Sequence, residues 1–276
     1  MHEQYINAIA AGSISGYCSV IICHPIDNIR TRIQADSNHI SITQRVQQIC
    51  AREGFRGFYK GFWPPFLGQG VYKAIIFSTN QYVAEQLFNN KKSFSSLFTC
   101  GCIAGAVNSF VVCPVELIRN RKIVDRRTHA TLHAPDVVRD MIRSRNVLGL
   151  WRGLTLTLLR DGPGVGLYFL SYEMMKQAFP EPMRGVFWSN LLSGCMAGVA
   201  YWAWALPLDT LKTHTQVTFE SSHDYSLRTM FRQYCSVRGI NRLFYAWPVA
   251  FGRGVPGAAV TLATYDAAYS YISNKA

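Results

Sequence analysis

Residues 25–34 are Pro-Ile-Asp-Asn-Ile-Arg-Thr-Arg-Ile-Gln, and a related sequence occurs twice more in the chain. Residues 114–123 are Pro-Val-Glu-Leu-Ile-Arg-Asn-Arg-Lys-Ile, and residues 207–216 are Pro-Leu-Asp-Thr-Leu-Lys-Thr-His-Thr-Gln. Each copy has a proline, an acid two residues later and a base three residues after the acid. Because the prolines recur roughly every 90 residues, we expect three repeated units over residues 1–91, 92–184 and 185–276.

A second element follows each proline motif at a similar distance. Its copies are Glu-Gly-Phe-Arg-Gly-Phe-Tyr-Lys-Gly at 53–61, Arg-Asn-Val-Leu-Gly-Leu-Trp-Arg-Gly at 145–153 and a degraded Arg-Gly-Ile-Asn-Arg-Leu-Phe-Tyr-Ala at 238–246. One Pro-x-Asp alone would mean nothing. Two elements that occur three times in the same order indicate a true internal repeat.

Each repeat also contains two long apolar stretches. The stretches before the prolines, residues 9–23, 99–113 and 191–206, contain pairs of glycines four residues apart, a spacing that lets membrane helices approach closely. The stretches after the second element are residues 62–88, 154–179 and 247–272. Segments of this length can span a bilayer. The sequence therefore predicts an all-α membrane protein with six transmembrane helices.

The composition supports this fold class. The 276 residues are 49% hydrophobic and only 16% charged, with a formal net charge of +12, whereas soluble domains have about 25% charged residues. No basic stripe with interleaved aromatics is present, so we expect no nucleic-acid partner. Basic residues gather in the loops after the first helix of each repeat, while the opposite connections hold little beyond Lys91, Lys92 and Arg184. The positive-inside rule puts the basic loops on the cytoplasmic or matrix side and both termini on the other.

Enzymatic and cofactor-dependent functions find no support in the motifs. The chain contains neither G-x-S-x-G nor H-E-x-x-H, and no Cys/His cluster with the spacing of a metal site. We therefore expect no enzymatic activity, no cofactor and no metal. Because Met1 to Tyr5 lead directly into an apolar stretch, we expect any targeting signal to be internal.

The two repeated elements together resemble those of the mitochondrial carrier family over essentially the whole chain. The resemblance implies six transmembrane helices in three pseudo-symmetric repeats around a central cavity, with a short matrix helix in each repeat. It also implies transport of a small-molecule substrate by alternating access, a monomeric protein in the mitochondrial inner membrane with both termini towards the intermembrane space, and bound cardiolipin at the second element.

The proline motifs place charged residues inside the membrane. The acid and base of each motif, at i and i+3, lie on one helix face. Charges at mid-membrane cost about 2.5–3.5 kcal/mol each, so they should be paired. The resemblance implies a matrix gate in which each acid meets the base of another repeat, with Gln34 and Gln216 bracing the pairs: Asp27–Arg119, Glu116–Lys212 and Asp209–Arg30. The alternative is that these pairs only hold the bundle together.

The second helix of each repeat predicts the substrate site. The seventh and eighth residues after Gly61, Gly153 and Ala246 align with the family's substrate contact points: Gly68 and Gln69, Arg160 and Asp161, and Arg253 and Gly254. Arginines can bind a carboxylate and the acid a cationic group. Glu116 and the ring of Trp202 are further candidates, the latter through a cation–π contact. The alternative is that Arg160 and Asp161 only neutralise each other. Adjacent helical residues point about 100° apart, which argues against that alternative.

The segment 153–173 is similar to the ornithine, basic amino acid and carnitine/acylcarnitine branch of the family. It implies a carboxylate-bearing cationic or zwitterionic substrate, of the basic amino acid, ornithine or methylated amino acid type. Carnitine or acylcarnitine is the second candidate, because Gly68 and Gly70 leave space for an acyl chain. A proton-leak or channel-like protein is a remote alternative.

The family's external gate is an aromatic-acid-x-x-base element near the end of the second helix of each repeat. Here it is Tyr172-Glu173-x-x-Lys176, Tyr265-Asp266-x-x-Tyr269 and Asn80-Gln81-x-x-Ala84. The pairs that the resemblance implies are Gln81–Lys176, Glu173–Tyr269 and Asp266–Ala84, and none is a complete ion pair. We therefore expect the carrier without substrate to rest with the matrix gate closed and the cavity open to the outside.

Overall fold

The computed structural model describes residues 2–35, 41–89, 93–124, 134–145, 147–184, 186–217 and 227–273, and all regular secondary structure in these ranges is helical. The long helices are α1 (His2–Ala35), α3 (Trp63–Phe88), α4 (Phe94–Val124), α6 (Leu154–Ala178), α7 (Phe187–Val217) and α10 (Gly254–Ser273). The shorter ones are α2 (Ile42–Glu53), α5 (Ala134–Arg145), α8 (Leu227–Arg238) and α9 (Trp247–Gly252). Single 3-10 turns are η1 (Phe55–Tyr59), η2 (Val147–Trp151), η3 (Glu181–Met183) and η4 (Ile240–Phe244).

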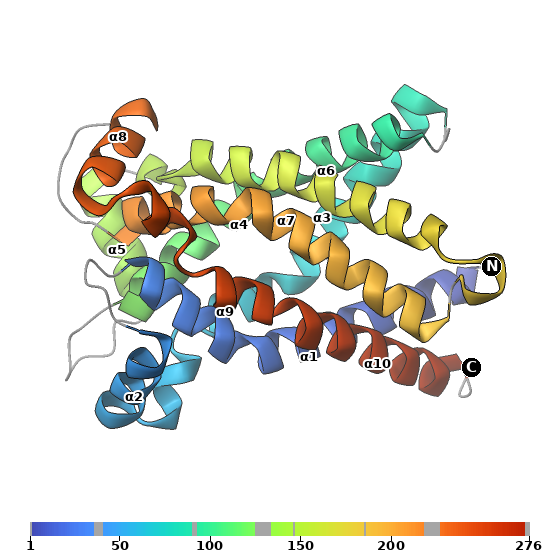
Figure 1. Ribbon diagram of the computed structural model, residues 1–276, viewed down its shortest axis with the longest axis horizontal. Coiled ribbons are helices and arrows are strands. Elements are labelled where there is room, and N and C mark those ends of the chain that lie inside the picture. The colour runs from blue at the N-terminus through green and yellow to red at the C-terminus, as the bar shows by residue number, and fades with distance from the viewer. Residues whose placement is uncertain are drawn as a thin grey trace.

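The long helices form a closed ring in chain order. Contacts join α1 to α3, α3 to α4, α4 to α6, α6 to α7, α7 to α10, and α10 back to α1. Figure 1 shows α2, α5 and α8 gathered at one end of the bundle, while α1 begins and α10 ends at the opposite end. Each repeat thus contributes two long helices and one short helix at that end, and the third repeat also contains α9. This is the all-α carrier architecture that the resemblance implies.

The first helix of each repeat continues through its proline. Pro25, Pro114 and Pro207 lie inside α1, α4 and α7, which run on for about three further turns. The acids and bases of the proline motifs therefore lie on the same helices as the apolar stretches. Gly61 and Gly153, with φ of 78° and 85°, make the turns into α3 and α6, because a positive φ favours glycine.

The last helix differs from its sequence prediction. We expected one continuous helix over residues 247–272, but α9 ends at Gly252 and α10 begins at Gly254. Glycines on both sides of Arg253 weaken the helix at this point, because glycine loses more conformational freedom than other residues in a helix. The break lies directly at one of the predicted substrate contacts.

Glycines on α4 bring that helix against α6. A Cβ built on Gly105 would lie 2.1 Å from the carbonyl oxygen of Asp161, and one on Gly101 would lie 2.8 Å from Cα of Gly166. This glycine pair therefore acts as the sequence predicts. Gly12 and Gly198 have no neighbour within 4 Å of such a Cβ, and the neighbours of Gly16 are the side chains of Gln69 and Lys73. Among these described glycines, only the pair of the second repeat meets the backbone of the neighbouring helix this closely. It fixes the backbone of Asp161 against α4.

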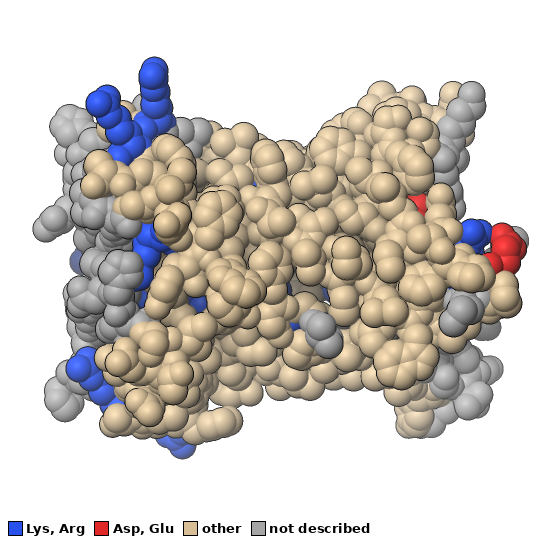
Figure 2. Space-filling model, in the orientation of Figure 1, with Lys and Arg blue, Asp and Glu red and all other residues tan. Residues whose placement is uncertain are grey.

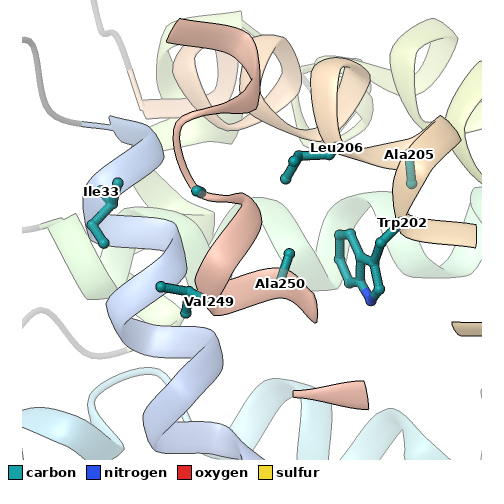
Figure 3. Packing of buried hydrophobic residues seen from close by; sticks show 7 residues of the cluster. Ile33, Trp202, Ala205, Leu206, Val249 and Ala250 are labelled. Carbon is teal, nitrogen blue, oxygen red and sulfur yellow. The ribbon is translucent and has the colours of Figure 1, made fainter. Parts of the chain in front are cut away.

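An apolar cluster closes the bundle where α1, α7 and α9 meet. It contains Ile33, Trp202, Ala205, Leu206, Ala246, Val249 and Ala250. In Figure 3, Trp202 and Leu206 extend from α7 towards the side of Val249 and Ala250 on α9. This packing holds the broken last helix against α1 and α7.

The face of the molecule in Figure 2 has charged ends and an almost uncharged belt between them. Figure 2 shows basic atoms gathered at the end that carries the short helices, a mixed group at the other end, and a broad surface between them almost free of charged atoms. Large apolar side chains such as Ile22, Phe77 and Phe110 are exposed. By length and hydropathy alone, α4 and α7 could each cross a membrane.

An ion pair joins the ends of α1 and α2. Arg32 donates from Nη1 to Glu53 Oε1 at 2.6 Å and from Nη2 to Oε2 at 2.9 Å. Partial burial raises the pKa of Glu53, but the hydrogen bonds and charge of Arg32 outweigh this effect and hold the pKa below its ordinary value. The pair lies outside the apolar belt, on the side of the short helices.

Candidate substrate-binding site

The ring encloses a cavity of about 590 Å³, a size that suits a small metabolite. All six long helices contribute to its wall. Asp27, Glu116 and Arg119 line it towards the end with the short helices, and Tyr172 and Asn190 line it towards the other end. The cavity therefore runs from the level of the proline motifs outwards.

Ion pairs between repeats form the floor of the cavity. Arg119 Nη2 lies 3.8 Å from Asp27 Oδ2, and Arg30 Nε lies 3.6 Å from Asp209 Oδ2. Nζ of Lys212, which is fully buried, contacts Oε2 of Glu116. The structure thus brings together the three acid–base combinations between α1, α4 and α7 that the resemblance implies.

The two glutamines that follow these motifs have different contacts. Gln34 Nε2 donates to Asp209 Oδ2 at 3.0 Å, beneath the pair with Arg30. Gln216 instead accepts from Asn120 Nδ2 at 2.8 Å and donates to the carbonyl oxygen of Arg152 at 3.2 Å. The amide group of Gln216 is thus hydrogen-bonded to Asn120 on α4 and to the backbone of residue 152. Gln216 therefore joins the ends of α4 and α7. The expectation that Gln216 braces an ion pair is wrong for this structure.

Arg160 is the centre of the charge network. Its Nη1 donates to Asp209 Oδ1 at 2.6 Å and its Nη2 to Glu116 Oε2 at 2.9 Å. Its Nε donates to Asp161 Oδ1 at 2.7 Å. We expected adjacent residues to point too far apart for this contact. That expectation is wrong, because the long arginine side chain folds back so that its guanidinium reaches the neighbouring carboxylate.

Asp161 has a second partner that the sequence did not single out as one. The hydroxyl of Tyr201 on α7 donates to Asp161 Oδ1 at 2.9 Å. The next residue, Trp202, lies with its ring 4.2 Å from the guanidinium carbon of Arg30. Trp202 lines the cavity, but its cation–π partner in this structure is part of the protein.

The remaining predicted contacts differ in their exposure to the cavity. Arg253 lines it, with Nε 3.2 Å from Asp27 Oδ1 and a third of its side chain exposed. Gln69 also lines it.

Gly68 is not among the described lining residues: a Cβ there would lie 2.4 Å from the hydroxyl of Tyr72. A Cβ on Gly70 would lie 3.3 Å from the hydroxyl of Tyr17. Tyrosines thus occupy the space that we expected these glycines to leave for an acyl chain.

Sequence analysis missed Lys73. Its side chain lines the cavity from α3 and donates from Nζ to the carbonyl oxygen of Gly12 at 3.2 Å. A lysine inside the apolar stretch 62–88, one turn after Gln69, was the available signal, since intramembrane charges generally mark functional sites.

At the outer end, the described gate candidates make contacts within their own helices. Gln81 Nε2 donates to Glu85 Oε1 at 2.9 Å, and Glu173 Oε1 accepts from Gln177 Nε2 at 2.9 Å. Lys176 Nζ lies 6.0 Å from the ring centroid of Tyr172. The described residues at this level show no ion pair between helices. The side chains of Asp266 and Tyr269 lie outside the described part of the structure.

Comparison with known proteins identifies the family. A family model described as "Mitochondrial carrier protein" matches residues 2–91, 90–182 and 184–276. The chain belongs to the mitochondrial carrier family. Members of this family are membrane transporters that bind small-molecule substrates, so the chain is a transporter and not an enzyme.

Several relatives of this carrier have different substrates in their names. The mitochondrial glycine transporter YMC1 of Saccharomyces cerevisiae is 28% identical over 286 residues, covering 97% of this chain and 93% of the relative. The mitochondrial carnitine/acylcarnitine carrier protein of Mus musculus is 24% identical over 282 residues, covering 96% and 94%. The mitochondrial arginine transporter BAC2 of Arabidopsis thaliana is 27% identical over 284 residues, covering 100% and 94%. Membership of the family therefore leaves the substrate to be argued from the cavity.

Proposed function

We propose that this mitochondrial carrier moves a small metabolite with both a carboxylate and an ammonium group across the inner membrane by alternating access. The observation that supports the proposal is the pair Arg160 and Asp161 in the cavity wall, together with Arg253 at the break between α9 and α10. Basic amino acids, ornithine and methylated amino acids have this combination of groups, and the arginine transporter is one of the relatives.

Arg253 is the first partner for the substrate carboxylate. Its guanidinium has one carboxylate neighbour at 3.2 Å and a third of the side chain is exposed, so donors remain available to a ligand. Asp161 would bind the ammonium group. Because Arg160 and Tyr201 already donate to Asp161, a substrate ammonium group binds there in competition with them. This competition favours a zwitterion, whose carboxylate can bind Arg160, over a metabolite that is only cationic.

Binding of a carboxylate by Arg160 would also release the gate. Arg160 holds Asp209 and Glu116, the acids of two of the pairs on the cavity floor. When its guanidinium turns to the substrate, both acids lose a partner and the floor becomes easier to open. Substrate recognition and opening of the matrix gate would then be one event.

Carnitine is the second candidate. It is itself a zwitterion, and a carnitine/acylcarnitine carrier is among the relatives. Tyr72 and Tyr17 beside Gly68 and Gly70 argue against a dedicated space for a long acyl chain at that wall. We therefore favour a substrate without such a chain.

The other residue roles follow the same scheme. The matrix gate comprises Asp27, Arg30, Gln34, Glu116, Arg119, Asp209 and Lys212, with Gln216 as a structural neighbour, and the external gate comprises Gln81, Glu173, Lys176, Asp266 and Tyr269. The basic end with α2, α5 and α8 faces the matrix, so that both termini face the intermembrane space. The carrier acts as a monomer of three units, 1–91, 92–184 and 185–276, with cardiolipin at residues 53–61 and 145–153.

A competition panel tests the proposal. The purified carrier is reconstituted into liposomes, and lysine, arginine, ornithine, methylated lysines, carnitine and acylcarnitines compete with one labelled, exchanging amino acid. We expect saturable exchange without bulk ion conductance. Conductance without exchange of any of these compounds would favour a leak or channel instead.

A further inference from the structure

All four carboxylates at the cavity floor have partners. Asp27 contacts Arg30, Arg119 and Arg253. Glu116 contacts Lys212 and Arg160. Asp161 contacts Arg160 and Tyr201. Asp209 contacts Arg30, Arg160 and Gln34. Among the described residues, this cluster leaves no carboxylate free to balance another base.

The bases outnumber these acids. Five of them, Arg30, Arg119, Arg160, Lys212 and Arg253, belong to the same cluster, which therefore has one positive charge in excess. Lys73 is a sixth base in the cavity wall. It has no carboxylate within ion-pair distance in the described ranges, and its one hydrogen bond there is to the carbonyl oxygen of Gly12. An ammonium group has three donors, so Lys73 has donors left for a ligand.

We propose that Lys73 binds a second anionic group of the transported metabolite, so that the substrate carries two acidic groups besides its ammonium. The proposal rests on the proposed function, because it assigns one acid to Arg253 and the ammonium to Asp161. Among metabolites that carry both groups, it selects acidic amino acids over basic ones. An unpaired charge inside a membrane protein is costly. An acidic group on the substrate would remove this cost and would reduce the positive excess of the cavity.

The depth of Lys73 fits such a molecule. A Cβ built on Gly16 of α1 would lie 3.2 Å from Gln69 Cγ and 3.0 Å from Lys73 Nζ, so both side chains reach α1 at about the same point. By its place in the repeat, Gln69 is at the level of Asp161 and Gly254. The Cα of Lys73 comes one turn later, about 6 Å further out, but its Nζ returns to the level of Gln69 at Gly16. Lys73 Nζ therefore lies at the level of the predicted substrate contacts, where one small metabolite can reach it together with Asp161 and Arg253.

Ligand-induced thermal stabilisation of the purified carrier tests this assignment without requiring a known exchange substrate. Glutamate is compared with glutamine, and glutarate with its monoamide, because each pair differs in one acidic group at nearly constant shape. The measurement is repeated with Lys73→Gln and with Lys73→Arg, which keeps the charge. The matched control is Lys122→Gln, at the end of α4 and outside the cavity lining.

We expect the wild type and Lys122→Gln to reach half-maximal stabilisation at a glutamate concentration about tenfold or more below that for glutamine, as a charge-assisted hydrogen bond implies. Lys73→Gln should abolish this difference, and Lys73→Arg should restore most of it. Equal concentrations for glutamate and glutamine in the wild type would overturn the proposal without any variant. An unchanged difference in Lys73→Gln would overturn it too. If only glutarate shows the dependence on Lys73 and no amino acid binds, the assignment of Lys73 holds and the proposed function fails.

Discussion

Arg160 Nη1 on α6 lies 2.6 Å from Asp209 Oδ1 on α7, so a predicted substrate contact holds an acid of the cavity floor. The same guanidinium reaches Glu116 on α4 at 2.9 Å. One side chain thus joins three helices at the depth of the proline motifs. This relationship links the substrate site to the gate and leads to the first prediction.

Arg160→Gln should destabilise the carrier strongly, because the carboxylates of Asp161, Glu116 and Asp209 each lose a charged partner. Breaking a buried ion pair costs about 3–5 kcal/mol, which corresponds to a fall in Tm of roughly 5–10 °C for a protein of this size. The measurement is the Tm of the purified protein without ligand. Arg184→Gln is the control, because Arg184 bonds the exposed Glu181 at 2.8 Å and such surface pairs contribute at most about 1 kcal/mol. Equal Tm values for the two variants would contradict the role of Arg160 in the floor.

Gln34→Leu and Gln216→Leu should differ in their effect on the gate, although the two glutamines occupy the same place in the repeat. Only Gln34 bonds a floor acid, Asp209. Losing a hydrogen bond to a charged group costs about 1.5–3 kcal/mol. We expect Gln34→Leu to increase the labelling of a cysteine at the cavity-lining position 19 by an impermeant thiol reagent added on the matrix side.

For that experiment, Ser19→Cys alone sets the baseline rate, and Gln216→Leu in the same background should leave the rate unchanged. A fivefold or larger increase is about what a loss of 1 kcal/mol in gate closure gives. Similar increases for both leucine variants would show that the helix ends, and not the contact with Asp209, control access.

Asp161→Asn should lower the transport efficiency kcat/KM for zwitterionic substrates by about tenfold or more, because the amide cannot attract an ammonium group as a carboxylate does. The Tm should fall less than in Arg160→Gln, since Arg160 keeps Glu116 and Asp209. Tyr201→Phe is the matched comparison, because it removes only the hydroxyl that donates to Asp161. Unaltered uptake by Asp161→Asn in proteoliposomes would remove Asp161 from the substrate site.

The pair Arg32–Glu53 predicts a pH-dependent contribution to stability. The pKa of Glu53 is lower in the folded protein than its ordinary value of about 4.3. The pair therefore stabilises the fold fully above that ordinary value, and the contribution disappears as pH falls through the lower, folded pKa. Partial exposure limits it to about 1 kcal/mol or less.

Measured from pH 7.5 down to the lowest pH at which the protein stays in solution, the Tm difference between wild type and Glu53→Gln should be constant above about pH 5.5 and shrink below about pH 4. A difference that grows as the pH falls would contradict this sign.

The repeat explains why much of this site could be predicted. A threefold motif puts an acid and a base on one face of each helix, the family resemblance implies the partners of Asp27, Glu116 and Asp209, and the structure pairs them between repeats. Features that break the repeat could not be predicted in the same way. The fold of Arg160 onto Asp161 depends on the reach of one side chain, and the break at Arg253 depends on glycines that only the third repeat has on both sides.

Lys73 and Gln216 are two further cases that the repeat could not predict: Lys73 lines the cavity without being expected to, and Gln216 does not brace an ion pair although that was expected. Lys73 has no counterpart in the repeated motifs, so alignment of the repeats passed over it although it lines the cavity. Gln216 has the same position in its repeat as Gln34, but its amide oxygen accepts a hydrogen bond from Asn120. In both cases the outcome depends on neighbours from other helices, which are known only after the helices are packed.

The central claim is that the cavity transports metabolites that carry both a carboxylate and an ammonium group. The most direct measurement is the exchange of labelled compounds by the reconstituted carrier, with ornithine compared with putrescine, carnitine with choline, and glutamate with glutarate. We predict saturable exchange of at least one zwitterion and at least about tenfold slower exchange of its partner that lacks the carboxylate or the ammonium group. Equally fast exchange of putrescine or choline, or no exchange of any zwitterion by folded protein, would contradict the claim.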